Sequence, residues 1–211
     1  PIYHTWATLS STLLGFGLGL VLGGSLSLAL ASSRVAVLSV MPWVITSQTI
    51  PIIAIAPMII VIMAPMGLTG LMPKGVISMY LSYFPIVIGM TKGLRSSDPI
   101  LEDQMKTWSA TAFQTFLLLR LPSALPYLFP AMKISLAAAL VGAVVAELPS
   151  GARAGLGARL LVFSYRSETI PMWANLVSAA ILAGLLVVSF GMLERALNRR
   201  LGFRTAGEVS S

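Results

Sequence analysis

The sequence predicts an all-α protein built as a polytopic bundle of transmembrane helices. Of its 211 residues, 56% are hydrophobic and only 10% are charged, whereas a typical soluble domain carries roughly 25% charged residues. The charged residues are also clustered, which leaves long stretches without any charge. So few charges cannot cover a water-facing surface, and hydrocarbon is therefore the expected solvent. The length fits a single transmembrane domain over 1–211.

The first three apolar segments have the composition of membrane spans. A helix needs about 20 apolar residues to cross a bilayer, and the uncharged segment at 9–31 meets that requirement. The second span is placed at 41–64, where Pro51 and Pro57 predict a kink or a partial break. Such prolines are tolerated where neighbouring helices or a cavity satisfy the freed backbone groups. A third, shorter span is expected at 75–91.

A polar segment at 92–126 follows the third span and mixes charges with a helical apolar pattern. Asp98 followed by Pro99 is typical of a helix start, because the aspartate caps free N–H groups and proline suits the first turn. A short helix is therefore predicted at 100–108. The charged residues of the segment are Lys92, Arg95, Asp98, Glu102, Asp103, Lys106 and Arg120.

The remainder of this segment predicts a second short helix at 111–119, which Pro122 and Pro126 should end. Ser109 lies at the turn between the two helices. A serine is expected to take this position only if its backbone avoids the left-handed conformation that favours glycine. Two short helices joined at a small residue would form a protruding knob.

Two further spans are predicted at 127–147 and 171–193. Lys133 lies one or two turns inside the first of them, where its aliphatic stem can carry the charge to the surface. The connection at 148–170 contains GARAGLGARL, which we interpret as a flexible outer loop. It follows a membrane span and lacks the strand–turn–helix setting of a dinucleotide site.

The distribution of basic residues predicts the orientation, because cytoplasmic loops carry an excess of Lys and Arg. With the C-terminus in the cytoplasm, 92–126 also lies inside, and ten of the 14 basic residues are cytoplasmic. This orientation leaves residue 1 outside, so a sixth span is expected upstream of the sequence. The four basic residues left on the outer side are Lys74, Arg153, Arg159 and Arg166.

Three glycines at four-residue spacing lie in the first span: Gly15, Gly19 and Gly23. Small residues at this spacing allow membrane helices to approach closely. Two interpretations remain open: packing within one subunit, or a seam between two copies.

Polar residues at membrane depth usually face a bundle interior or an aqueous cavity. Ser47 and Gln48 precede Pro51, and Gln48 would bind either a passing polar solute or a neighbouring helix. Glu147 ends the fourth span and would contribute to an outer gate or a docking surface, or be a solvated helix end. Ser47, Gln48 and Glu147 are therefore the candidate residues of a translocation pathway.

The sequence argues against catalysis and metal binding. It has no cysteine and a single histidine, His4, so a zinc site cannot be assembled. No GxxxxGK[ST] motif is present, which excludes a phosphate-cradling P-loop. The seven acidic residues lie mostly in loops and supply no catalytic set. No catalytic residue, metal ligand or cofactor of its own is expected, and an integral membrane enzyme is disfavoured.

The segment 101–126 reads LEDQMKTWSATAFQTFLLLRLPSALP and resembles the EAA loop of permease subunits of bacterial ABC importers. The similarity covers roughly 8–200 and includes VITSQTIPIIAIAPMIIV, FPIVIGMTKGLRSSDP and PAMKISLAAALVGAVVAEL. Permeases of the nitrate, taurine, alkanesulfonate and pyrimidine-precursor type are the most similar in appearance. The sequence departs from the family at 103–105, where Asp-Gln-Met replaces acidic-Ala-Ala, and at Ser109, where glycine is usual.

The resemblance implies the type I importer fold and a role for the loop as the coupling helix that inserts into an ATPase subunit. The alternative for the loop is an ordinary amphipathic helix at the membrane interface. The residues expected to contact the ATPase are Glu102, Asp103, Gln104, Met105, Lys106, Thr107, Trp108, Ser109, Ala110, Thr111, Phe113 and Phe116.

The resemblance also implies the partners and the location. The partners are a second permease copy in a homodimer, two ATP-binding subunits that hold ATP and Mg, and an extracytoplasmic binding protein. The location is the bacterial inner membrane. Nucleic acid is not expected as a partner, because the Lys and Arg residues flank apolar segments and are not gathered on one polar face. The solute is left open between an anion, such as nitrate or a sulfonate, and a neutral heterocycle, such as a pyrimidine precursor. The cation-poor spans favour the heterocycle. The alternative function is an ion-gradient-driven secondary transporter, which would require ionisable residues inside the spans.

Overall fold

The computed structural model describes residues 2–149 and 154–201, and the regular structure in these ranges is helical. The predicted all-α helical bundle is confirmed. Four described helices are long and apolar enough to cross a membrane: α1 (Ile2–Ala31), α4 (Leu71–Leu94), a continuous helix over Ala112–Glu147, and α9 (Thr169–Leu201). A fifth span results if α2 (Arg34–Ser47) and α3 (Ile52–Met63) are counted together.

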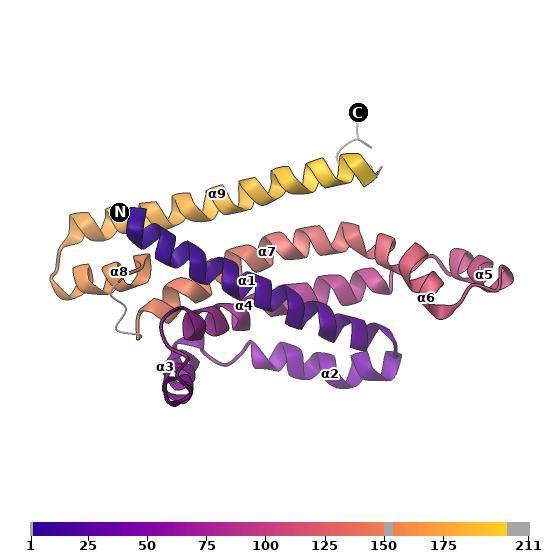
Figure 1. Ribbon diagram of the computed structural model, residues 1–211, viewed down its shortest axis with the longest axis horizontal. Helices are drawn as coiled ribbons and strands as arrows, with labels where there is room; N and C mark the ends of the chain where they lie inside the picture. The colour runs from indigo at the N-terminus through magenta and orange to yellow at the C-terminus, as the bar shows by residue number, and fades with distance from the viewer. Residues whose placement is uncertain (1, 150–153, 202–211) are drawn as a thin grey trace.

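The second predicted span is divided into two helices. The axes of α2 and α3 differ by 93°, and Figure 1 shows α3 turned across the other helices. Pro51 is the N-cap of α3, so the break falls at this residue, whereas Pro57 lies inside α3. The short 3-10 helix η1 (Ala64–Met66) follows and leads towards α4.

Helices α1, α4 and α7 (Leu121–Glu147) form the packed centre of the bundle (Figure 1). Small residues let their backbones approach closely, as is typical of membrane helices. A Cβ added to Gly142 of α7 would lie 2.7 Å from the Cα of Ser78 in α4. The buried Ser78 hydroxyl donates to the carbonyl of Ala139 at 2.6 Å. Polar contacts between backbones and short side chains therefore hold this core together.

The glycine row of α1 packs within the subunit. Gly15 and Gly19 face Ser78 and Ser82 of α4, and the Ser82 hydroxyl donates to the carbonyl of Gly15 at 3.1 Å. A Cβ on Gly23 would lie 2.8 Å from the carbonyl oxygen of Tyr83, also in α4. The row therefore faces α4 of the same chain, as the first of the two interpretations predicts.

The expectation that Pro122 and Pro126 end a helix is wrong. Helix α6 (Ala112–Thr115) continues through the π-helical segment η2 (Phe116–Arg120) into α7, which contains both prolines. The N–H of Leu121 bonds to the carbonyl of Phe116, five residues back. This wider turn lies directly before Pro122 and makes room for its ring, which would otherwise clash with the preceding turn.

The connection predicted as a flexible outer loop contains a helix, α8 (Leu156–Tyr165). Residues 150–153, including Arg153, lie outside the described residues. Gly155 and Gly157 are buried and lie against the end of α7. The expected flexible loop is therefore wrong for α8, because these glycines permit close packing on α7.

The two ends of the bundle differ in structure. The start of α1, the end of α7 and α8 lie together at one end in Figure 1. Helices α5 (Pro99–Thr107) and α6 project at the opposite end, towards which the C-terminal end of α9 also points. The continuous helix over Ala112–Glu147 connects the two ends.

Candidate functional site

Helices α5 and α6 form a knob that projects from the bundle, and local sequence signals define its first helix. The Asp98 carboxylate accepts a hydrogen bond from the N–H of Ile100 at 2.9 Å, and Pro99 occupies the first turn. Both features match the predicted helix start. They satisfy or remove N–H groups that have no partner inside the helix.

The turn at the end of α5 corrects the expectation for Ser109. Its φ is +54°, in the left-handed region that was expected to be avoided. The N–H of Ser109 donates to the carbonyl of Lys106 and that of Ala110 to the carbonyl of Met105, both at 2.9 Å. This pair of bonds is a Schellman motif, which satisfies the last helical carbonyls and offsets the strain of a left-handed serine.

The start of α6 is fixed by a capping box. The Thr111 hydroxyl accepts from the N–H of Gln114 at 3.3 Å, and the Gln114 side chain accepts from the N–H of Thr111 at 2.8 Å. Only Ala110 separates this box from Ser109. Each helix end at the turn therefore has its own hydrogen bonds, so the knob has a defined shape.

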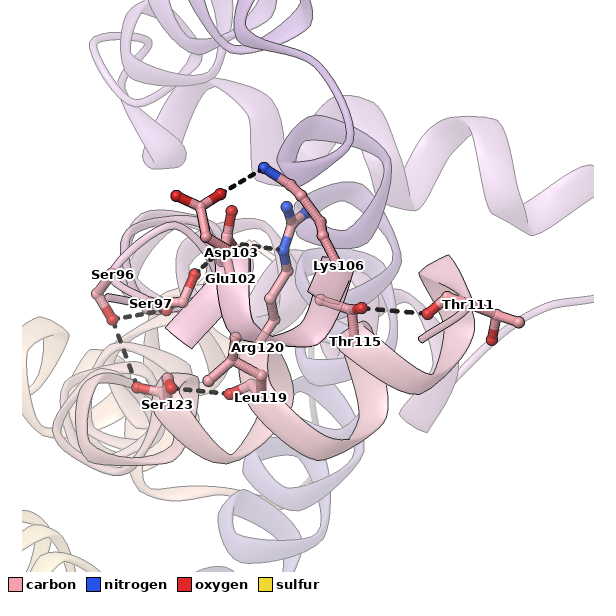
Figure 2. A network of polar contacts seen from close by, with 11 residues as sticks. Ser96, Ser97, Glu102, Asp103, Lys106, Thr111, Thr115, Leu119, Arg120 and Ser123 are labelled. Atoms are coloured by element: carbon pink, nitrogen blue, oxygen red, sulfur yellow. Dashed lines mark hydrogen bonds and ion pairs between the residues drawn. The ribbon is translucent and has the colours of Figure 1, made fainter. Parts of the chain in front are cut away.

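A polar network anchors the knob to the bundle (Figure 2). The Glu102 carboxylate accepts from the hydroxyl of Ser97 at 2.5 Å and from Nε of Arg120 at 3.1 Å. The Ser97 bond lowers the pKa of Glu102 below its ordinary value, with a smaller contribution from Arg120. Glu102 is therefore charged at neutral pH and joins α5 to the segment that continues into α7. The Ser96 hydroxyl adds a weaker contact to the carbonyl of Ser123.

The tip of the knob presents large apolar side chains. Trp108 is 74% exposed and Phe113 71% exposed. Beside them, Lys106 and Asp103 form an exposed ion pair at 2.8 Å, and this contact raises the pKa of Lys106. Exposed aromatic side chains beside charged groups are typical of a protein-binding surface.

The structure gathers the predicted contact residues into this one knob. Most of them are exposed, whereas Phe116 is partly buried and packs against Met90, Leu94 and Ala124 of the bundle. Phe116 therefore supports the knob from beneath. The other partly buried residues of the predicted set are Glu102, Met105 and Ala110.

Ser47 and Gln48 lie at the break between α2 and α3 and contact α4. The Ser47 hydroxyl is 2.5 Å from the hydroxyl of Tyr83, and the hydroxyl of Tyr80 donates to the Ser47 carbonyl. The Gln48 amide donates to the carbonyl of Tyr80 at 3.3 Å. These are helix–helix hydrogen bonds. Sequence reasoning missed the two tyrosines, which are three residues apart in a span and can both reach one neighbour.

The interpretation of Glu147 as a solvated helix end is wrong. Its exposed fraction is 1%, and its carboxylate accepts from the Thr8 hydroxyl and from the N–H of Gly157. Lys133 likewise has a partner that sequence reasoning missed, because it forms an ion pair with Glu194 of α9.

Among the described residues, no group of three or more His, Cys, Asp or Glu side chains is placed to hold a metal ion.

The family model described as binding-protein-dependent transport system inner membrane component matches residues 15–203. A probable ABC transporter permease protein of Haemophilus influenzae is 33% identical, over 82% of this chain and 69% of its own length. The formylaminopyrimidine transport permease protein ThiX of Halalkalibacterium halodurans is 34% identical, over 73% of this chain and 60% of its own. The riboflavin transport system permease protein RibX of Chloroflexus aurantiacus is 34% identical, over 93% of this chain and 71% of its own length.

Solved structures show the same fold. An inward-facing structure of the MetNI methionine ABC transporter aligns with a TM-score of 0.81 at 22% identity, over 92% of this chain and 94% of that one. An amino acid ABC transporter aligns with a TM-score of 0.68 at 16% identity, over 92% of this chain and 90% of that one. The chain therefore belongs to the family of inner-membrane components of binding-protein-dependent transport systems and has the fold of an ABC importer permease.

Proposed function

We propose that this chain is the permease subunit of an ATP-driven importer and that separate ATPase subunits dock on the knob formed by α5 and α6. The observation that carries the proposal is that one knob has both an exposed aromatic surface, at Trp108 and Phe113, and an anchor to the bundle. The anchor is the ion pair between Glu102 and Arg120. The aromatic side chains provide a surface for a partner. The anchor transfers a push on that surface to α7.

The continuous helix over Ala112–Glu147 supports a mechanism of rigid-body movement. ATP and Mg bind to the partner subunits, whose closure moves the two knobs of a homodimer inwards and opens the bundles outwards. Hydrolysis of ATP then returns the knobs and the bundles to their starting positions. Alternating access requires ligands that bind the two states with different affinity, and ATP and the loaded binding protein supply this difference. In this arrangement the C-terminus is cytoplasmic, and the chain itself binds no cofactor.

The solute is a neutral nitrogen heterocycle. Two relatives at 34% identity are named for formylaminopyrimidine and riboflavin transport, whereas the putative aliphatic sulfonates permease SsuC of Bacillus subtilis is 26% identical. The predicted spans at 9–31, 41–64, 75–91 and 171–193 carry no cation that would attract an anion. Both observations favour the heterocycle over nitrate or a sulfonate.

The test is ATP hydrolysis by the complex reconstituted in nanodiscs, after co-expression with the candidate ATPase and binding protein. We expect hydrolysis to rise when the binding protein is loaded with a pyrimidine or a flavin. Stimulation by nitrate or a sulfonate alone would contradict the heterocycle. Failure of any ATPase to co-purify, with uptake driven by an ion gradient alone, would contradict the importer and favour the secondary transporter.

A further inference from the structure

A buried carboxylate joins three helices at the end of the bundle opposite the knob. Glu147 is the last residue of α7 and is 1% exposed. Its two oxygens lie 2.9 and 3.1 Å from the hydroxyl of Thr8 in α1, and one of them accepts from the N–H of Gly157 in α8 at 2.8 Å. The Thr8 oxygen also accepts from the N–H of Leu156 at 2.9 Å. We call Thr8, Glu147, Leu156 and Gly157 the clasp.

The backbone around the clasp is shaped to admit the carboxylate. A Cβ on Gly157 would lie 3.0 Å from the Cβ of Glu147, and one on Gly155 would overlap its carboxylate. Gly155 has a φ of +135°, and its N–H donates to Nδ1 of His4 in α1 at 3.2 Å. The start of α8 is therefore fixed to both α1 and α7.

The hydrogen bonds of the clasp hold α8 in place more specifically than an apolar contact would. A carboxylate is costly to bury unless hydrogen bonds satisfy it, and hydrogen bonds fix direction and register in a way that apolar packing does not. Because Thr8 acts as donor to α7 and acceptor from α8, a displacement of either helix breaks one of its bonds. The clasp therefore links the positions of α1, α7 and α8.

The clasp and the knob lie at opposite ends of one continuous helix, Ala112–Glu147. We propose that Thr8 and Glu147 are positioning residues that make α8 move with α7, so that displacement of the knob reaches the far end of the bundle. The proposal rests on the proposed function, because it assumes that an ATPase moves the knob. Rigid-body movement of packed elements is a common form of conformational switching, and α8 follows α7 in such a movement only if the contacts between them persist.

The test compares Thr8→Val, which removes the hydroxyl at nearly constant volume, with Thr8→Ser, which keeps it. In the reconstituted complex, we expect Thr8→Val to reduce the stimulation of ATP hydrolysis by loaded binding protein about tenfold. The rate without binding protein should be retained, and Thr8→Ser should restore the stimulation. If Thr8→Val does not assemble, the smaller Thr8→Ala variant removes the hydroxyl and replaces it in the test.

Equal loss of both rates in Thr8→Val, or full stimulation in it, would overturn the proposal. A wild-type complex that shows no stimulation would contradict the proposed function, and a second measurement then decides the clasp. Leu156→Cys places a thiol where the wild-type side chain is 3% exposed. We expect a maleimide to label it slowly in the otherwise wild-type chain and rapidly in combination with Glu147→Gln or Thr8→Val. Equal labelling rates would refute the clasp.

Discussion

At the scale of single residues, the knob depends on side chains and backbone angles that perform separate tasks. Ser109 supplies a left-handed turn, Glu102 anchors the knob, and Trp108 provides its most exposed aromatic surface. Ser167 ends α8 with the same left-handed conformation, at φ +56°. The two serines give a matched pair in which one lies in the proposed docking surface and the other lies far from it.

Replacing Ser109 with glycine should stabilise the protein by about 1 kcal/mol, because glycine adopts the left-handed region without a Cβ penalty. Ser167→Gly should have a similar effect, since it relieves the same strain at the end of α8. Thermal unfolding of the purified permease would measure both. A lower unfolding temperature for Ser109→Gly would show that the serine side chain contributes more than its backbone costs.

Truncating Trp108 to alanine should weaken association with the ATPase by about 2 kcal/mol, or roughly 30-fold, which is typical of a central aromatic residue in an interface. Binding of the purified ATPase to the permease in nanodiscs would measure this. Trp173→Ala is the control, because Trp173 is also exposed, at 61%, but lies in α9. Equal affinity of the two variants would remove Trp108 from the docking surface.

At the scale of helices, the packing of α1, α4 and α7 depends on close backbone approach at small residues. Gly142 packs directly on the backbone of Ser78, whereas Gly184 of α9 has open space around the position of a Cβ. The two glycines therefore separate two effects of adding a methyl group, which are overlap with a neighbour and a change in helix propensity.

Gly142→Ala should destabilise the protein by about 1–3 kcal/mol, because the new methyl group meets backbone atoms that cannot move aside. Gly184→Ala should be neutral or slightly stabilising, since alanine is the better helix former and nothing obstructs its methyl group. Thermal unfolding in detergent compares the two. Equal unfolding temperatures would mean that α4 and α7 are packed less tightly than the structure indicates.

At the scale of the whole molecule, the knob and the clasp lie at opposite ends of the bundle, so each should meet a different compartment. With a membrane-impermeant thiol reagent added outside intact cells, Arg166→Cys should be labelled and Gln104→Cys should not. Both wild-type residues are exposed, so burial does not decide the result. Labelling after permeabilisation is the control for Gln104→Cys, and the reverse pattern would invert the predicted orientation.

Much of the helical architecture could be predicted from the sequence, because hydropathy and helix capping are local properties. The uncharged stretches indicated membrane helices, Asp98 and Pro99 gave the start of α5, and Pro51 gave the break in the second span. The resemblance of 101–126 to a known loop located the knob. These features depend on residues that are neighbours in the chain.

The partners of the polar groups depend on contacts between residues that are far apart in the chain. Thr8 and Glu147 are 139 positions apart in the chain, and no local pattern pairs them. The same holds for the contact of Ser47 with Tyr83, and for the glycines that pack α8 on α7. The glycine-rich segment forms a helix because Gly155 and Gly157 allow it to pack against α7. Pro122 stays inside a helix because the π-helical turn before it makes room for its ring. Local sequence patterns therefore predict the membrane environment and the positions of the helices, because they depend on neighbouring residues. Contacts between distant residues select which of the few polar groups are buried together.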